Sequence, residues 1–402
     1  MRHSTERIRT THGGNLPRPK EFDELLQQGP VVTAEVAEQL PDAVQWVVDR
    51  QLDCGVDVIN DGEYVKAAGG GSYAGYIHQR VSGWEVLTID PAKPPKRDGV
   101  GGRERRTFPG FYESGLWFQG SGGPVRPGYF KPGAPPVPAT ERVATGPVSY
   151  TGYAAIQADV DALTKALAGK PDQAEGFVAA LGPLSLGAGA RNEYYSSEEE
   201  YMVAVADVMR EEYKAVTDAG FIVQIDEPEF ATSWQFYPDW DVPQYRRYLE
   251  FCVEIINHAL AGLPEEQIRF HVCWGSGHRP HVTDIDLKDI ADLLIKVNAQ
   301  AYSVEAGNVR HAHEWTVWRD VRLPDGKILV PGVISHATDL VEAPGLVAER
   351  LVNYASVVGR ENVQGGTDCG IGSRVGHEEI VWAKLRAMAD GAALASKQLW
   401  HK

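Results

Sequence analysis

The sequence predicts a (β/α)8 TIM barrel, and three observations support this fold class. Eight short apolar segments are typical of strands, and longer segments with helical periodicity alternate with them. This alternation favours a parallel α/β fold, and eight strands are the number that closes a barrel. Polar residues follow most strand candidates at their C-terminal ends, where barrel enzymes carry their active sites. An open doubly wound sheet is the alternative, but no G-x-G-x-x-G motif follows the first strand.

The expected elements run through the chain in a regular order. The strand candidates are RIRTTH (7–12), VDVIND (56–61), VATGPVSY (143–150), FIVQIDE (221–227), IRFHVCW (268–274), AYSVEA (301–306), KILVPGVISH (327–336) and NVQGGTD (362–368). The helical stretches are PDAVQWVVDRQLD (41–53), SEEEYMVAVADVMREEYKAVTDAG (197–220), VPQYRRYLEFCVEIINHAL (242–260), DIADLLIKV (289–297), LVAERLVNYASVV (346–358) and EEIVWAKLRAMADGAALAS (378–396). Ser196 or Ser197 is expected to cap the second helical stretch, and Gly220 suits its end.

Length and composition indicate one large domain, which we place at residues 1–402 as a single catalytic barrel. The apolar fraction of 43% supports a sizeable core, and the net charge of −16 argues against nucleic-acid binding. No apolar run is long enough to span a membrane, and the first residues lack the apolar stretch of a secretory signal. With only four cysteines, we expect reduced thiols and a cytoplasmic location.

One segment interrupts the alternation of strands and helices. Residues 66–142, between the second and third strand candidates, are irregular and rich in Gly, Pro and aromatic side chains. Connections of this length are uncommon in compact domains and often form lids, binding loops or oligomer contacts. We therefore expect a long insertion after the second strand, at the barrel mouth. A homo-oligomer stays open as an alternative.

Four side chains at predicted strand ends form a set that suits zinc. His271 and Cys273 are two residues apart on one strand candidate and would share a face, while Glu305 and Cys369 follow two later strands. Zinc binds imidazole nitrogen, thiolate sulfur and carboxylate oxygen in a tetrahedron. Two core residues would explain the H-x-C pair equally well, but the two further donors favour a metal. Two thiolates make zinc electron-rich, which suits activation of a thiol better than hydrolysis.

Eight short motifs carry a resemblance to a known family. They are THGGNLPRP (11–19), DGE (61–63), GPVSY (146–150), IDEP (225–228), HVC (271–273), SVEAGN (303–308), GVISH (332–336) and GTDCGIGSR (366–374). Together they resemble the cobalamin-independent methionine synthase family, in particular its catalytic C-terminal barrel and its shorter stand-alone relatives. The resemblance covers nearly the whole chain. It implies a barrel that uses Zn²⁺ to activate a thiol, homocysteine in that family, which receives a methyl group to give methionine.

The resemblance also implies roles for individual residues. The residues that match the family's zinc ligands are His271, Cys273, Glu305 and Cys369. Those that match its homocysteine-binding positions are Gly13, Gly14, Asn15, Glu63 and Asp226. His336 matches the proton donor to the departing nitrogen of the methyl donor, and Asp339 is expected to orient it. A helix cap is the structural alternative for Asp226, and a capping or supporting role is the alternative for His336. The family usually carries a serine where Asn15 stands.

The expected partners are a small-molecule thiol and a methyl donor, either a methyl-folate or a methyl-corrinoid protein. The alternative function is a zinc-dependent alkyltransferase for another thiol and electrophile, similar to the related epoxyalkane–coenzyme M transferase. The aromatic side chains and basic cluster of the 66–142 insertion would then serve an apolar electrophile and an anionic thiol. A non-catalytic scaffold or metal-storage protein that kept the ligands is a third, less favoured class.

Overall fold

The computed structural model describes most of the chain. It covers residues 1–26, 33–66, 73–89, 101–114, 140–170, 174–275, 279–372 and 374–401. Among these residues, none of the helices combines the length and the apolar character that a membrane span requires.

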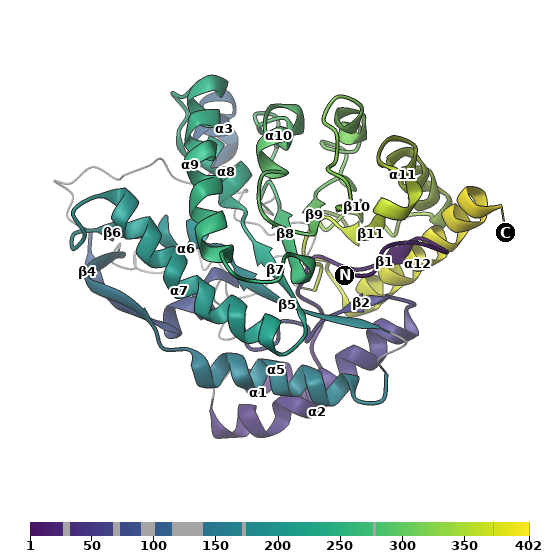
Figure 1. Cartoon of the computed structure of the whole chain (residues 1–402), viewed down its shortest axis with the longest axis horizontal. Coiled ribbons are helices and arrows are strands. Elements are labelled where there is room, and N and C mark those ends of the chain that lie inside the picture. Colours follow the sequence, from purple (N-terminus) through teal and green to yellow (C-terminus); the bar gives the residue numbers. More distant parts are fainter. Residues whose placement is uncertain are drawn as a thin grey trace.

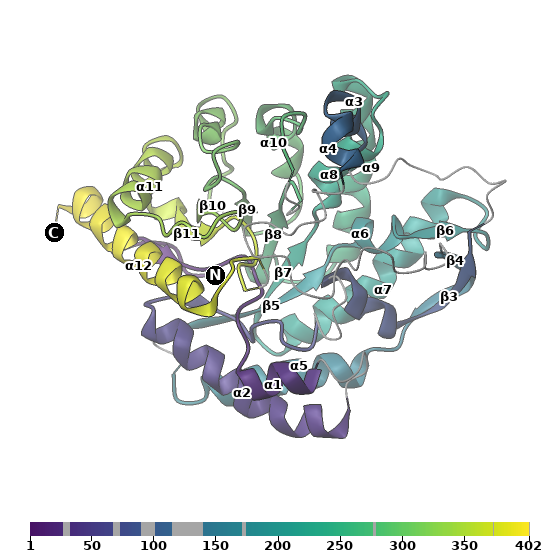
Figure 2. The ribbon, with the colours of Figure 1, turned by 180° about the vertical axis from the view of Figure 1, so that it is seen from behind.

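Eight parallel strands form a barrel at the centre of the molecule, with helices around it (Figures 1 and 2). In spatial order the strands are β1 (Arg9–Thr10), β11 (Gln364–Thr367), β10 (Ile328–Ile334), β9 (Ala301–Val304), β8 (Ile268–Val272), β7 (Ile222–Asp226), β5 (Glu175–Leu181) and β2 (Val58–Ile59). The two ends of this series meet, because the Asp57 N–H donates to the Thr10 carbonyl over 3.0 Å. The predicted (β/α)8 fold is therefore confirmed.

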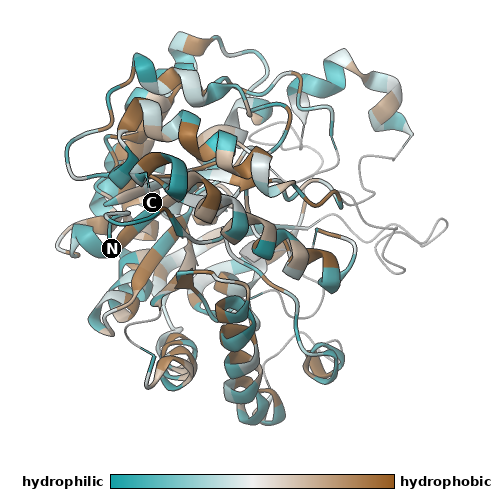
Figure 3. Cartoon of the chain, turned by 90° about the vertical axis from the view of Figure 1, so that its right-hand side faces the viewer, coloured by the Kyte–Doolittle hydropathy of each residue, from teal (hydrophilic) through white to brown (hydrophobic). Residues whose placement is uncertain are grey.

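The longer helices alternate with the strands and cover the outside of the barrel, whereas α3 and α4 belong to the insertion. They are α1 (Lys20–Leu26), α2 (Ala34–Asp53), α3 (Gly102–Thr107), α4 (Pro109–Glu113), α5 (Tyr153–Leu167), α6 (Pro183–Gly187), α7 (Glu198–Asp218), α8 (Glu229–Phe236), α9 (Val242–Leu260), α10 (Ala291–Leu294), α11 (Pro344–Val358) and α12 (Glu378–Trp400). Short 3-10 turns are Tyr73–Gln79, Glu265–Gln267, Leu287–Asp289, Glu314–Arg319 and Arg360–Asn362. The helices carry both apolar and polar segments (Figure 3), as expected when one face packs on the strands.

The long helices begin where the sequence provides caps. Ser197 caps α7, since its hydroxyl accepts the N–H of Glu200 over 3.1 Å, as one of the two predicted serines should. Asp241 and Gln244 form a reciprocal capping box at the start of α9. These caps fix where each helix starts, and thereby the length of the loop that precedes it.

The prediction of the third barrel strand was wrong. Residues 143–150 lie in β4 (Thr140–Tyr150), which pairs with β3 (Val81–Thr88) and β6 (Ala190–Asn192) in a separate three-stranded sheet. The third barrel strand is β5, whose sequence EGFVAAL is rich in small residues and gives a weak strand signal. Residues of β4 alternate between buried and exposed, which is typical of a sheet with one solvated face.

The predicted 66–142 insertion is only partly described, because 67–72, 90–100 and 115–139 lie outside the described residues. The described parts contain a 3-10 turn, β3, α3 and α4, so they are more regular than expected. Since β5 is the third barrel strand, the connection that leaves the barrel after β2 continues to residue 174.

The inside of the barrel changes from apolar to polar along β7. Phe177, Ala179 and Ile222 form a small apolar cluster with Val58 inside the barrel. Two and four residues beyond Ile222, the same face of β7 carries Gln224 and Asp226. The apolar layer thus forms a floor, and the C-terminal ends of the strands carry the polar groups of the candidate site.

Candidate metal centre and substrate pocket

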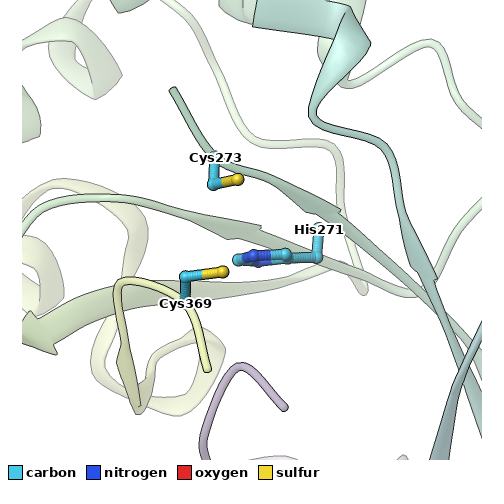
Figure 4. Close-up of side chains that lie close together, drawn as sticks. All are labelled: His271, Cys273 and Cys369. Carbon is cyan, nitrogen blue, oxygen red and sulfur yellow. The ribbon is translucent and has the colours of Figure 1, made fainter. Parts of the chain in front are cut away.

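Three of the four predicted zinc ligands meet at the C-terminal end of the barrel. His271 lies on β8, Cys273 follows that strand, and Cys369 follows β11 (Figure 4). A ring nitrogen of His271 and the two sulfur atoms all lie within 4.8 Å of one another. His271 and Cys273 are buried, with exposed fractions of 1% and 6%. β8 pairs with β7 on one side and with β9 on the other, and Cys369 reaches its two partners from the end of β11.

The pKa values of the three side chains depend on one sulfur atom, that of Cys369. The hydrogen bond from Cys273 lowers the pKa of the Cys369 thiol well below its usual value, against the effect of burial, and His271 adds to this shift. The same hydrogen bond, together with burial, raises the pKa of Cys273 well above its usual value. Burial alone would lower the pKa of His271, but the neighbouring Cys369 sulfur raises it. Cys369 is therefore the more acidic of the two thiols.

The donor set fits a metal ion. Nδ1 of His271 is 3.0 Å from the Ser303 hydroxyl, whereas Nε2 is buried without a hydrogen-bond partner. A ligating histidine normally bonds a neighbour through its second nitrogen, which fixes the ring and its tautomer. One imidazole and two thiols are ligands that zinc binds readily. Thiolate and imidazole ligands suit zinc, copper or iron and disfavour magnesium and calcium.

Glu305 lies in an adjacent group rather than among the three ligands. Its carboxylate is within 4.8 Å of ligand atoms of His336 and Asp368. Its Oε1 accepts the N–H of Trp274 over 2.8 Å, and its Oε2 accepts the side-chain amide of Asn308 over 2.7 Å. Burial and then the Asp368 carboxylate raise the pKa of Glu305 well above its usual value. A cation beside it would relieve this unfavourable charge.

The first loop reaches the metal group because glycines allow it. A Cβ on Gly13 would lie 2.7 Å from the Cys369 carbonyl carbon, and one on Gly14 would lie 2.3 Å from Oε1 of Glu63. Gly14 also has φ of 144°, which disfavours any other residue. The N–H groups of Gly13 and Gly14 bond Thr367 Oγ1 and His12 Nδ1. These two glycines therefore shape the pocket, with Asn15 next in the same loop.

Glu63 and Asp226 form a buried pair of acids beside this loop. Their exposed fractions are 2% and 9%, and Oε1 of Glu63 has no hydrogen-bond partner. Burial, and then the charge of Asp226, raise the pKa of Glu63 well above its usual value. Gln224 Nε2 donates to Asp226 Oδ1 over 2.7 Å and to the Gly13 carbonyl over 2.9 Å. The pair is an anionic subsite that a positively charged group would complete.

His336 is buried beside Glu305 and Asp368, and its Nδ1 has no hydrogen-bond partner. Burial lowers the pKa of His336 to about 3, so the free ring is neutral at pH 7. The predicted partner Asp339 accepts the backbone N–H of Gly376 over 2.7 Å instead. The structure therefore places His336 at the site, whereas the contact of Asp339 is with Gly376.

Three further polar residues support the site, although the sequence had given no role there to any of them. Ser303 bonds His271, Gln224 links Asp226 to the first loop, and Asp368 accepts the N–H groups of Ala306 and Gly307. Each lies one or two residues from a predicted site residue on a barrel strand. Spacing of two along a strand is the signal that could have indicated Ser303 and Gln224.

The fold and the site define a class of protein: a parallel barrel with a buried imidazole–dithiol group at its C-terminal end. Residues 139–394 match the family model described as the catalytic domain of cobalamin-independent synthase. Because this match covers more than half of the 402 residues, the chain belongs to that family.

Individual relatives are distant. A methionine synthase of Sulfurisphaera tokodaii is 26% identical over 224 residues, which are 55% of this chain and 57% of that relative. A 2-hydroxypropyl-CoM lyase of Xanthobacter autotrophicus is 24% identical over 98% of this chain and 96% of its own length. A solved B12-independent methionine synthase from Shewanella sp. W3-18-1, in complex with selenomethionine, has a TM-score of 0.70 at 21% identity. The match covers 98% of this chain and all of the Shewanella chain, and it supports the assignment of the fold.

Proposed function

We propose that this protein is a zinc-dependent methyltransferase that transfers a methyl group to a thiol, with homocysteine as the favoured acceptor. The observation that carries this proposal is the presence of two complementary groups at one barrel mouth. An imidazole–dithiol group suits a metal that binds sulfur, and the Glu63–Asp226 pair suits an ammonium group. Homocysteine carries both a thiol and an ammonium group. The family relationship and the name of the Sulfurisphaera relative agree with this choice.

The proposed zinc site consists of His271, Cys273, Cys369 and Glu305. Zinc bound there would hold the incoming thiol as a thiolate near neutral pH, which makes it a nucleophile. The lowered pKa of Cys369 reduces the work of deprotonating that ligand, whereas the raised pKa of Cys273 increases it for the other thiol. Glu305, which Trp274 and Asn308 hold in the neighbouring group, would be the fourth ligand.

The chain's own residues would position the acceptor and control protons. Asp226 and Glu63 accept hydrogen bonds from the ammonium group, and the loop of Gly13, Gly14 and Asn15 lies where the carboxylate would be received. His336 would deliver a proton to the departing nitrogen of the donor. Because the low pKa leaves the free ring neutral at pH 7, this role requires that the bound donor raise the pKa of His336, so that the ring takes up a proton from solvent before it passes the proton on.

The test is a methyl-transfer assay combined with direct binding. Zinc-loaded protein is given homocysteine and either a methyl-folate or a methylated corrinoid protein, and methionine is measured. Asp226→Ala is expected to abolish homocysteine binding in calorimetry while zinc content stays normal. Asp239→Ala removes an acid that is 82% exposed and is the matched control. Unchanged homocysteine binding by Asp226→Ala would contradict the amino-acid part of the proposal.

A second candidate is an alkyltransferase that uses a thiol sulfonate. It is favoured by the 2-hydroxypropyl-CoM lyase relative, whose match extends over 96% of that protein. The buried acids disfavour it, because Glu63 and Asp226 would repel a sulfonate near the thiol. Competition between homocysteine and coenzyme M for the zinc-loaded protein separates the two. Tighter binding of coenzyme M would favour the second function.

A further inference from the structure

The loop that follows β9 is held by a single buried carboxylate. Oδ1 of Asp368 accepts the N–H of Ala306 over 2.7 Å and that of Gly307 over 2.6 Å. Asp368 is fully buried, and a Cβ on Gly332 would lie only 2.2 Å from this oxygen. The strand pair of β10 and β11 therefore leaves room for this carboxylate because residue 332 is glycine. The backbone directly after Glu305 is fixed as a result.

Asn308, in the same loop, uses both ends of its side-chain amide. Its Oδ1 accepts the N–H of Arg310 over 3.0 Å and that of His311 over 3.1 Å. Its Nδ2 donates to Oε2 of Glu305 over 2.7 Å and to Oδ2 of Asp368 over 3.3 Å. Because the oxygen already accepts two backbone N–H groups, the NH₂ group must face the two carboxylates. The amide thus links the turn to the acid group.

The carboxylate of Glu305 is consequently held by one donor on each oxygen. Trp274, directly after Cys273, donates its backbone N–H to Oε1, and Asn308 donates to Oε2. Each carboxylate oxygen still has a lone pair for a metal. Hydrogen-bonded partners of this kind orient ligating carboxylates, and removing them typically lowers metal affinity about 10- to 100-fold.

We propose that Asn308, fixed by Asp368, is a positioning residue that orients Glu305 as a metal ligand. This inference rests on the proposed function, since it requires a metal at the His271, Cys273 and Cys369 group. The NH₂ group of Asn308 faces Glu305, whereas the side-chain oxygen only shapes the turn.

The experiment removes the donor of the amide and keeps an acceptor oxygen for the turn. Asn308→Asp keeps an oxygen that accepts the N–H groups of Arg310 and His311, but it replaces the donor to Glu305 with a second acceptor. Asn308→Ser also keeps an acceptor for the turn and adds no charge. Zinc affinity is measured by competition with a chromophoric chelator, and the visible spectrum of the cobalt-substituted protein reports the ligand set.

We expect both variants to lose zinc affinity about 10- to 100-fold, with Asn308→Asp the weaker binder, and to show an altered cobalt spectrum. Asn362→Ala is the matched control, because that amide donates to the Val358 carbonyl over 2.9 Å at the end of α11. It should bind zinc and cobalt like the wild type.

The outcomes separate this inference from the proposed function. If wild-type protein binds no zinc, the proposed function fails and this inference fails with it. If wild-type protein binds zinc but Asn308→Asp and Asn308→Ser bind it equally well with unchanged cobalt spectra, only the role of Asn308 is refuted. If Glu305→Ala leaves zinc affinity unchanged, Glu305 is not a ligand; this refutes the role of Asn308 and removes Glu305 from the proposed zinc site, but leaves His271, Cys273 and Cys369 as ligands.

Discussion

Replacing Glu63 with glutamine should stabilise the empty protein and weaken binding of the acceptor. Glu63 is buried, and its Oε1 has no hydrogen-bond partner. Burial and the nearby charge of Asp226 raise its pKa well above its usual value of 4.5. Residue 63 has φ of 57°, but this backbone conformation is the same in both proteins and does not enter the difference. An uncharged amide removes the repulsion between the two acids.

The direction of the pH effect follows from the raised pKa. The folded protein binds the Glu63 proton more tightly than the unfolded chain does, so this contribution to stability is fully present below the ordinary pKa of 4.5. It is lost as the pH rises through the folded-state pKa. A buried group without a partner costs about 1–3 kcal/mol, so we expect Glu63→Gln to raise the free energy of unfolding by about that amount at pH 8. Near pH 4 the difference should be small.

The assay is urea unfolding of metal-free protein at several pH values, with homocysteine binding measured on zinc-loaded protein. A hydrogen bond to a charged group contributes about 1.5–3 kcal/mol, so homocysteine affinity should fall about 10- to 100-fold. Glu349→Gln, which alters an exposed glutamate on α11, should change neither quantity. The reasoning is refuted if Glu63→Gln is less stable than wild type at pH 8, or if it binds homocysteine equally well.

Three further predictions concern the packing and the metal. Arg80→Met should lower the free energy of unfolding by about 3–5 kcal/mol in urea, because Asp159, 2.7 Å away, and Glu212, 3.5 Å away, stay buried without their cation. Phe177→Ala should lower it by about 3–5 kcal/mol, since Phe177 fills the apolar floor of the barrel. Cys369→Ser should abolish tight zinc binding in chelator competition, and wild-type zinc affinity should fall as the pH decreases, because protons compete for the thiols. Unchanged values in these measurements would contradict each prediction.

The sequence was sufficient for the fold class because seven of the eight barrel strands have strong signals. β7, β8 and β10 are rich in β-branched and aromatic residues, and polar residues lie at or shortly after their C-terminal ends, so the sequence alone indicates strands there. β5 was missed because Gly and Ala contribute little strand preference, although both sides of this strand are covered in the barrel. The neighbouring segment 143–150 has a stronger signal but pairs antiparallel with β3. The pairing of strands depends on tertiary contacts, which local residue preferences do not predict.

The site could be predicted as a list of residues but not as an arrangement. Spacing placed His271 and Cys273 on one face, and motif order added Cys369, and the structure brings all three together. The separate position of Glu305 depends on donors from Trp274 and Asn308, which no spacing rule identifies. Side-chain hydrogen bonds across strands form only after the barrel closes.

The proposed metal ligands alone do not separate the two proposed functions. Both proposed functions require the same imidazole and thiolate set, so the choice must come from groups around it. Two such groups are visible among the described residues. One is the acid pair of Glu63 and Asp226, which favours a positively charged acceptor.

The other is the inserted helix α3. Its Glu104 is fully buried and lies 3.9 Å from Arg279, and Arg279 donates to the Trp274 carbonyl over 2.9 Å. The insertion is therefore linked through Arg279 to the residue next to Cys273. Its neighbour Arg103 donates to the carbonyls of Trp234 and Tyr237, which fixes α3 on the loop after β7. Because α3 is held to two barrel loops at the mouth, changes in the insertion should alter the choice of substrate without altering the metal ligands.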